Sequence, residues 1–175
     1  KQFGKKAYIT KATSQLMRDL GSIPSPNNCF LLNIGLETLP LRMERHCSNA
    51  QKTAEFLASH EKVSKVIYPG LPGDKYHALA EKYLPSGSCG VISFELEGGR
   101  EAAVRFMDSL ELANICTHVA ASKTMVLHPA SHTHRQMNDE QLREAGVSPG
   151  MIRLSVGIEH IDDILADLEK ALKNA

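Results

Sequence analysis

The sequence predicts an α/β fold in which one small sheet is covered mainly on one face by helices. From residue 62 onwards, short apolar segments typical of strands alternate with segments whose apolar residues recur at helical spacing. Before that point only helical patterns occur. The chain has 175 residues, 42% of them hydrophobic, and is therefore long enough to bury a substantial core. We accordingly assign residues 1–61 to helices and residues 62–175 to a small α/β domain.

The first part of the chain predicts a series of helices. Residues 6–20 place apolar side chains at helical spacing, and Gly21 is a natural stop. A loop rich in proline follows, after which the apolar residues 29–36 predict a buried helical segment. A longer helix is expected over residues 38–60, with Thr38 as its N-cap. Its apolar face comprises Leu39, Met43, Cys47, Ala50, Ala54 and Leu57.

The second part of the chain predicts alternating strands and helices. Runs rich in β-branched residues, bounded by glycine and proline, predict strands, and runs with apolar residues three to four apart predict helices. Asn138 is expected to cap the helix that follows it. The expected strands are 63–68, 91–96, 115–119, 124–127 and 151–158, and the expected helices are 76–84, 100–110, 139–145 and a last one from residue 161.

Composition excludes several classes of partner. Twenty basic and twenty acidic residues are scattered along the chain, so we expect neither a nucleic-acid nor a membrane partner. No apolar run approaches the roughly 20 residues that a membrane-spanning helix needs. The four cysteines form no C-x-x-C pair, which favours reduced thiols in the cytoplasm. Because the chain begins with lysine and enters a helical pattern directly, we expect it to be a fragment.

Arg153 is the most informative single residue. It lies inside the apolar run of residues 151–158, and an arginine keeps its positive charge at any physiological pH. A guanidinium in such a run therefore predicts a nearby anion. Two explanations remain open at this point, namely an edge-strand salt bridge to aspartate or glutamate, or a bound anionic ligand.

Histidines in the sequence HPASHTH invite a metal-site hypothesis. His128, His132 and His134 could act as zinc ligands, with His118 as a fourth. Pro129 interrupts any helix that would align the first two, however. We therefore favour a polar turn beside a functional site and expect no bound metal.

A cysteine nucleophile is a second chemical hypothesis. Cys116 and His118 are two residues apart on an expected strand, so their side chains would share a face. Small buried cysteines are more common than catalytic ones. The sequence motifs of nucleotide-binding loops and of the serine-hydrolase elbow do not occur, so no complete catalytic set emerges from the residues alone.

Three ordered blocks give the chain a specific family resemblance. They are IGLETLPLRMERH at residues 34–46, HPAS at residues 128–131 and IRLSVGIE at residues 152–159. With these blocks, and with the longer stretches 7–28 and 128–159, the chain resembles the pyridoxal-phosphate enzymes of cysteine and methionine metabolism. The likeness extends over essentially all of its length.

This resemblance implies the C-terminal domain of a fold-type I enzyme. In the family, the lysine that binds pyridoxal phosphate covalently lies in a larger N-terminal domain, in a motif that this chain lacks, and Lys11 is not that lysine. Residues 1–61 would then be helices that link the two domains. The cofactor would be held only in the complete enzyme, with no cofactor-binding residue in this chain, which would be inactive alone. Its own N-terminal domain would be a partner, and homotetramers are usual in the family.

The resemblance also implies a reaction and its site residues. In the γ-replacement reaction, acetate leaves O-acetylhomoserine, and sulfide or a thiol takes its place to give homocysteine or methionine. Arg153 matches the arginine that binds the substrate α-carboxylate. His118 falls where relatives often carry serine or asparagine, and Thr133 is placed to line the site. Ala120 and Ala121 replace a glycine and an aspartate that are usual in relatives.

Other functions remain open at this stage. Within the same family, the alternatives are a γ-lyase or γ-synthase that acts on methionine or cystathionine. Outside it, a non-catalytic α/β module could bind small carboxylates or partner proteins.

Overall fold

The computed structural model describes residues 4–175. Two compact units divide the chain, Lys1–Pro40 and Leu41–Ala175, and we describe each by itself.

The described part of the first unit consists of helices and turns joined by a loop at residues 21–25. A 3-10 turn precedes α1, and a π-helical turn connects α1 to α2; Gly21 then ends this stretch with φ 66°, in the left-handed region that glycine adopts readily. Ser25 caps α3 because its side chain accepts a hydrogen bond from the Asn28 amide at 3.2 Å. The elements are η1 (Gly4–Lys6), α1 (Ala7–Lys11), η2 (Ala12–Met17), α2 (Arg18–Leu20) and α3 (Pro26–Glu37).

Helix α3 corrects one expectation from the sequence. It begins at Pro26, before the expected start at residue 29, because proline fits the first turn and Ser25 supplies the cap. The expectation of burial was wrong, since no residue of α3 is buried. Phe30, Leu31 and Leu32 are consecutive, so the apolar side chains point in several directions and not toward one face.

The second unit contains a five-stranded sheet in the order β1-β2-β5-β4-β3. All neighbouring strands are antiparallel except β3 and β4, which are parallel. The central strand β5 pairs with β2 on one side and with β4 on the other. The strands are β1 (Val63–Ile67), β2 (Val91–Leu96), β3 (Asn114–Ile115), β4 (Met125–Leu127) and β5 (Met151–Ser155).

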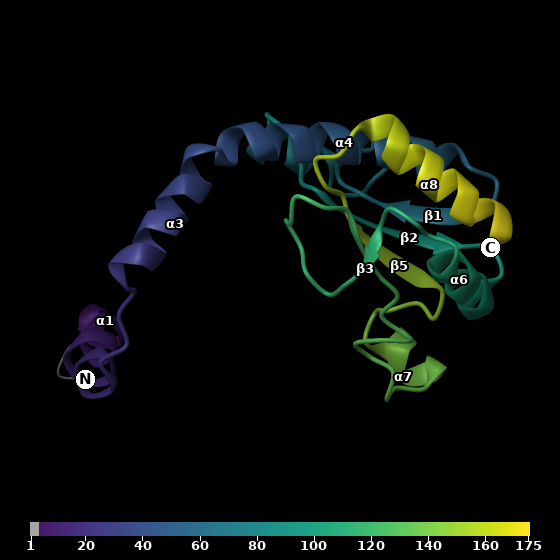
Figure 1. Ribbon diagram of the computed structural model, residues 1–175. Helices are drawn as coiled ribbons and strands as arrows, with labels where there is room; N and C mark the ends of the chain where they lie inside the picture. The colour runs from purple at the N-terminus through teal and green to yellow at the C-terminus, as the bar shows by residue number, and fades with distance from the viewer. Residues whose placement is uncertain (1–3) are drawn as a thin grey trace. The chain divides into compact units, whose positions relative to one another are not determined.

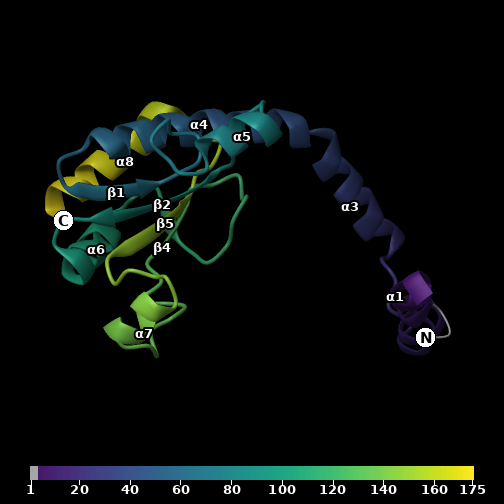
Figure 2. The ribbon, with the colours of Figure 1, turned by 180° about the vertical axis from the view of Figure 1, so that it is seen from behind.

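Helices cover one face of this sheet, which confirms the predicted fold class. Along β2 the residues at positions 92, 94 and 96 are buried, while those at positions 91, 93 and 95 are only half-buried. The buried set joins one core with residues of α4, α6 and α8, and Phe94 meets Phe106 edge to face at 5.6 Å. Figures 1 and 2 show α4 and α8 running side by side along the sheet. These helices are α4 (Leu39–Ser59), α6 (Gly99–Asp108) and α8 (Ile161–Asn174).

Two short helices complete the unit. Helix α5 (His77–Tyr83) follows the turns after β1, and α7 (Asp139–Glu144) precedes β5. Asn138 caps α7 as predicted, in a reciprocal capping box with Gln141. Within residues 4–175, no helix has both the length and the apolar character that a membrane crossing requires.

The face of α4 differs in part from the predicted one. Of the predicted stripe, Ala50, Ala54 and Leu57 are buried, but Leu39 and Met43 are exposed. The buried face instead includes polar residues next to the stripe. They are His46, Asn49 and Thr53.

Two strands end three or more residues earlier than predicted. Strand β3 ends at Ile115, and β5 ends at Ser155. The backbone after β3 makes one further sheet hydrogen bond, from the Cys116 amide to the Val126 carbonyl at 3.0 Å, and then leaves the ladder. The predicted assignment of residues 1–61 to linking helices stays a prediction.

Candidate carboxylate-binding site

Arg153 lies on the central strand of the sheet. In the strand register it is opposite Ser93 on β2 and opposite Leu127 on β4. Its neighbours Ile152 and Leu154 are fully buried in the core, so the arginine side chain points to the opposite face. A central position rules out the edge-strand explanation of this residue.

The guanidinium of Arg153 is anchored but not neutralised. One Nη donates a hydrogen bond to the Thr117 carbonyl at 2.7 Å. Its Nε is buried and has no hydrogen-bond partner. Among residues 4–175, no carboxylate forms an ion pair with it, so the salt-bridge explanation fails for the described part of the chain. A buried, unsatisfied and charged donor is costly unless a ligand completes it.

The segment of residues 117–122 packs against the end of β5. Besides the contact with Arg153, the Ala120 amide donates to Ser155 Oγ at 3.1 Å, and the Ile158 amide donates to the Ser122 carbonyl at 2.9 Å. Three bonds thus connect this segment to β5 and the residues that follow it.

Helix α4 fixes the chain that leaves β5. His46 is buried, and its Nδ1 donates a hydrogen bond to the Val156 carbonyl at 2.7 Å. Asn49 Nδ2 donates to the carbonyls of Gly157 and Glu159 at 3.0 and 2.9 Å. Since these donors lie on one buried face of the long helix α4, they hold the residues that follow β5 against that helix.

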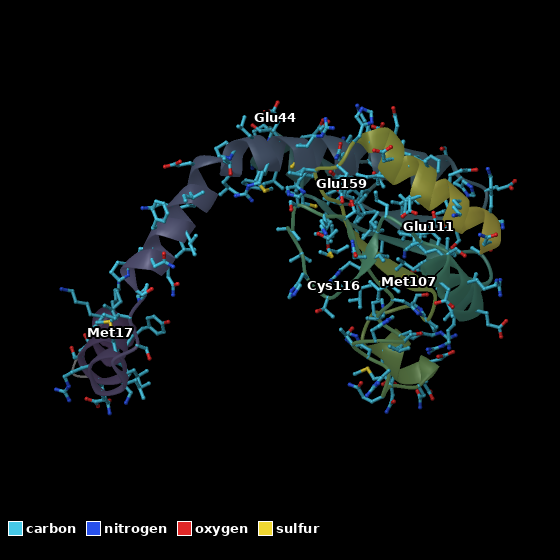
Figure 3. All side chains as sticks on the ribbon, viewed as in Figure 1. Met17, Glu44, Met107, Glu111, Cys116 and Glu159 are labelled. Carbon is cyan, nitrogen blue, oxygen red and sulfur yellow. The ribbon has the colours of Figure 1, made fainter. Side chains whose placement is uncertain are left out.

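Glu159 connects the segment that follows β5 to the residue just before β4. Its carboxylate accepts hydrogen bonds from the Thr124 amide at 2.6 Å and from the Thr124 hydroxyl at 2.9 Å. The approach is so close at Gly157 that a Cβ atom there would lie 2.5 Å from the Thr124 amide nitrogen, which explains the glycine. Figure 3 shows Glu159 just below α4.

His128 fixes the chain that enters β5. It is fully buried, and its Nε2 donates to the Pro149 carbonyl at 2.8 Å, while Nδ1 has no partner. Burial is the largest effect on this side chain and lowers the pKa of His128, so the neutral imidazole is favoured. Both ends of β5 are therefore held by buried histidines that donate to backbone carbonyls.

The turn after His128 is held from α6. One Nη of Arg100 donates to the Ala130 carbonyl at 3.1 Å, and the other forms an ion pair with Asp139 at the start of α7. His132 Nδ1 is 3.0 Å from the His128 carbonyl, which tightens the turn. The predicted polar turn is thus present beside β5.

His118 and Thr133 are less closely tied to Arg153. Both side chains are exposed. Thr133 Oγ1 lies 2.9 Å from His134 Nδ1, and within residues 4–175 no hydrogen bond joins either residue to Arg153. His118 belongs to the segment whose Thr117 carbonyl anchors Arg153, which places it nearer the site along the chain. Their role as lining residues stays a prediction.

The nucleophile hypothesis for Cys116 and His118 loses its geometric basis. The alternation argument required a strand over residues 115–119, but β3 ends at Ile115. In the described part of the chain, no three histidine, cysteine or acidic side chains are grouped closely enough to hold a metal ion. The expectation that HPASHTH binds no zinc stays a prediction, which elemental analysis of the purified protein can check.

Three positioning residues were not identified from the sequence. His46 and Asn49 belong to the buried face of α4, and Ser155 lies on β5 two residues after Arg153. The sequence did contain a signal for His46 and Asn49, because polar residues at helical spacing beside an apolar stripe need hydrogen-bond partners when they are buried. Ser155 gave no comparable signal, since its partner Ala120 is 35 residues away in sequence.

Residues 4–175 do not fit covalent attachment of pyridoxal phosphate. A lysine that attacks an aldehyde must be partly neutral, which requires burial or a neighbouring cation. No lysine in this range is buried, and the half-buried Lys62 donates its Nζ to the carbonyls of Lys173 and Ala175. The residues described here can bind and orient an anion, but they offer no place to attach the cofactor.

Comparison with known proteins identifies relatives of the whole chain. An O-acetyl-L-homoserine sulfhydrylase of Leptospira meyeri is 52% identical over 169 residues, covering 96% of this chain and 38% of the relative. A homocysteine synthase of Schizosaccharomyces pombe is 46% identical over 173 residues, covering 99% of this chain and 40% of the relative. The chain thus spans about two fifths of the length of these curated relatives.

Solved structures give the same result. A Campylobacter jejuni structure that contains N'-pyridoxyl-lysine-5'-monophosphate has a TM-score of 0.87 and 39% identity, covering 98% of this chain and 41% of that one. An O-acetylhomoserine sulfhydrylase of Wolinella succinogenes has a TM-score of 0.77 and 36% identity, covering 98% and 45%. The model of the family described as Cys/Met metabolism PLP-dependent enzymes matches residues 3–173. The chain therefore belongs to the family of pyridoxal-phosphate-dependent enzymes of cysteine and methionine metabolism.

Proposed function

We propose that this chain is the substrate-binding C-terminal part of an O-acetylhomoserine sulfhydrylase, and that Arg153 binds the α-carboxylate of the amino-acid substrate. One observation carries the proposal. Arg153 is a permanently charged residue on a central strand, with a buried Nε that has no partner and no carboxylate ion pair within residues 4–175. A bound carboxylate would supply both the missing acceptor and the missing negative charge.

The surroundings of Arg153 suit a positioning role. The Thr117 carbonyl holds one Nη, and His46 and His128 hold the two ends of the strand. A guanidinium so constrained binds a carboxylate in one orientation, because its donors form a planar fork. Correct orientation of the substrate relative to the reacting groups is worth several orders of magnitude in rate.

The reaction follows from the relatives and needs the rest of the enzyme. O-acetylhomoserine would exchange acetate for sulfide or a thiol, giving homocysteine or methionine. Pyridoxal phosphate, held elsewhere in the complete enzyme, supplies the electron sink for this chemistry. The chain alone would bind the substrate carboxylate but would not catalyse.

The surface of the first unit supports a further domain as partner. Phe30, Leu31 and Leu36 on α3 are all more than half exposed, and such exposed apolar side chains favour contact with another protein surface. Accordingly, we assign residues 1–61 to helices that link this part to an N-terminal domain, and we infer a homotetramer. All four cysteines are free, as expected for a protein of the cytoplasm.

The test is Arg153→Ala in the complete enzyme. We expect kcat/KM for O-acetylhomoserine to fall, because a desolvated charge pair is lost. The loss should correspond to about 2 to 5 kcal/mol of transition-state stabilisation. Arg153→Lys should recover only part of this, since a point charge does not fix the orientation of a carboxylate. Arg105→Ala, which removes an exposed arginine from α6, is the matched control.

Two outcomes would contradict the proposal. Near-normal kcat/KM in Arg153→Ala, with an unchanged unfolding transition, would return Arg153 to a structural role. Products that lack the added sulfur would instead indicate a γ-lyase of the same family, while leaving the carboxylate assignment intact.

A further inference from the structure

Ala120 has a backbone conformation that alanine rarely adopts. Its φ is 60°, and it is the one residue other than glycine with positive φ within residues 4–175. In this conformation the Cβ atom crowds the following carbonyl oxygen, so the chain adopts it only where surrounding contacts hold it. Such contacts must therefore exist around Ala120.

Ser155 provides the contact at Ala120 itself. Its Oγ accepts a hydrogen bond from the Ala120 amide at 3.1 Å, and the serine is only 2% exposed. Because the hydroxyl is buried, its removal leaves the Ala120 amide without this fixed acceptor. Ser155 is two residues after Arg153 on β5, so both side chains lie on the same face of the sheet.

The turn at Ala120 lies close in sequence to the Thr117 carbonyl. That carbonyl anchors one Nη of Arg153 at 2.7 Å, and it is three residues before Ala120. On the other side of the turn, the Ser122 carbonyl is held by the Ile158 amide at 2.9 Å. The left-handed residue thus lies midway between two attachments to β5 and the chain that leaves it.

We propose that Ser155 is a positioning residue for substrate binding. By holding the left-handed turn at Ala120, its hydroxyl keeps the Thr117 carbonyl in place, and that carbonyl orients the Arg153 guanidinium toward the substrate carboxylate. Ser155 does not itself touch the substrate. This inference rests on the proposed function of Arg153 and extends it to a residue that acts through the 117–122 segment.

Hydrogen exchange on the chain tests the contact directly. In Ser155→Ala we expect the Ala120 amide to exchange at least tenfold faster than in the wild type, because its acceptor is gone. Ser93→Ala is the matched control: Ser93 is opposite Arg153 in the register of β2 and makes no hydrogen bond to the 117–122 segment. Unchanged exchange at Ala120 in Ser155→Ala would overturn the inference.

Kinetics of the complete enzyme test the positioning role. Ser155→Ala should lower kcat/KM for O-acetylhomoserine about tenfold, because the arginine is present but less well oriented. Adding Ala120→Gly should restore most of the lost kcat/KM, since glycine adopts a positive φ without help from Ser155. A serine with only a packing role in the core would show no such rescue by a change at residue 120.

The outcomes separate the two proposals. If Arg153→Ala lowers kcat/KM but Ser155→Ala does not, or if Ala120→Gly fails to rescue Ser155→Ala, the positioning role is wrong and the carboxylate assignment stands. If Arg153→Ala leaves kcat/KM unchanged, the proposed function fails, and the positioning inference fails with it.

Discussion

The two faces of the sheet are built for different purposes. On one face, Ile152 and Leu154 of β5 pack with helices in a continuous apolar core. On the other face, Arg153 of the same strand is half-buried, lacks an ionic partner within residues 4–175 and donates a hydrogen bond to the Thr117 carbonyl of a loop. Neighbours in sequence thus serve stability on one face and, in our proposal, substrate recognition on the other, because alternate residues of a strand point to opposite faces. The comparison can be tested one residue at a time.

The largest effect should come from the covered face. Ile152→Ala removes a fully buried side chain from the core and should lower the free energy of unfolding by about 2 to 5 kcal/mol. Denaturant unfolding of the chain measures it. Ser93→Ala, a change on the opposite face, should stay within about 0.5 kcal/mol of the wild type. Equal losses in the two variants would contradict the separation of roles.

A charged residue on the covered face should also act through stability. Asp167 of α8 is buried, and its carboxylate accepts hydrogen bonds from the amides of Glu111 and Ala113 at 2.8 and 2.9 Å. Asp167→Ala leaves two amides without an acceptor and should cost about 1.5 to 3 kcal/mol of unfolding free energy. Asp163→Ala, on the same helix but exposed, is the control. A loss of less than 0.5 kcal/mol would show that other groups or water replace the carboxylate.

His128, which is buried and holds the chain that enters β5, predicts a dependence of stability on pH. Burial lowers its pKa in the folded state below the ordinary value near 6.5. Above that value both states are neutral; as the pH falls below it, the unfolded state binds the proton first, so stability decreases toward acid pH by at most about 1.4 kcal/mol per pH unit from this residue.

The measurement is denaturant unfolding of the wild type and of His128→Gln between pH 8 and pH 5. At pH 8, the difference in unfolding free energy between the two proteins reports the packing lost in the variant. The change in this difference toward pH 5 reports the titration of His128. We expect the glutamine variant to lose less stability than the wild type over this range. Parallel curves for the two proteins would exclude His128 as the source of the dependence.

The smallest expected effect concerns the cofactor. Mixing the chain with pyridoxal phosphate and reducing with borohydride should label no single lysine stoichiometrically, because no lysine of residues 4–175 is buried. Mass spectrometry of the digested protein identifies the labelled positions. A unique, stoichiometric adduct would contradict the proposal that the covalent lysine belongs to another part of the enzyme.

Local patterns predicted most of the secondary structure. The strands β1 and β2, the helices α5 and α6 and the Asn138 cap of α7 follow from apolar spacing and capping residues, which act over a few residues of sequence. The errors occurred where tertiary contacts decide. The burial of α3 failed because apolar residues alone do not supply a partner surface, and β3 ended early because a strand lasts only as long as its neighbour pairs with it.

By itself, the sequence determined that a charged residue lies in an apolar strand, because charge and β-propensity are properties of single residues and their neighbours. Only the tertiary structure decided that this strand is central and that the guanidinium is anchored by the Thr117 carbonyl. The same holds for His46, whose contact with Val156 joins residues 110 positions apart. Such contacts depend on the packing of whole helices against the sheet, which no local pattern encodes.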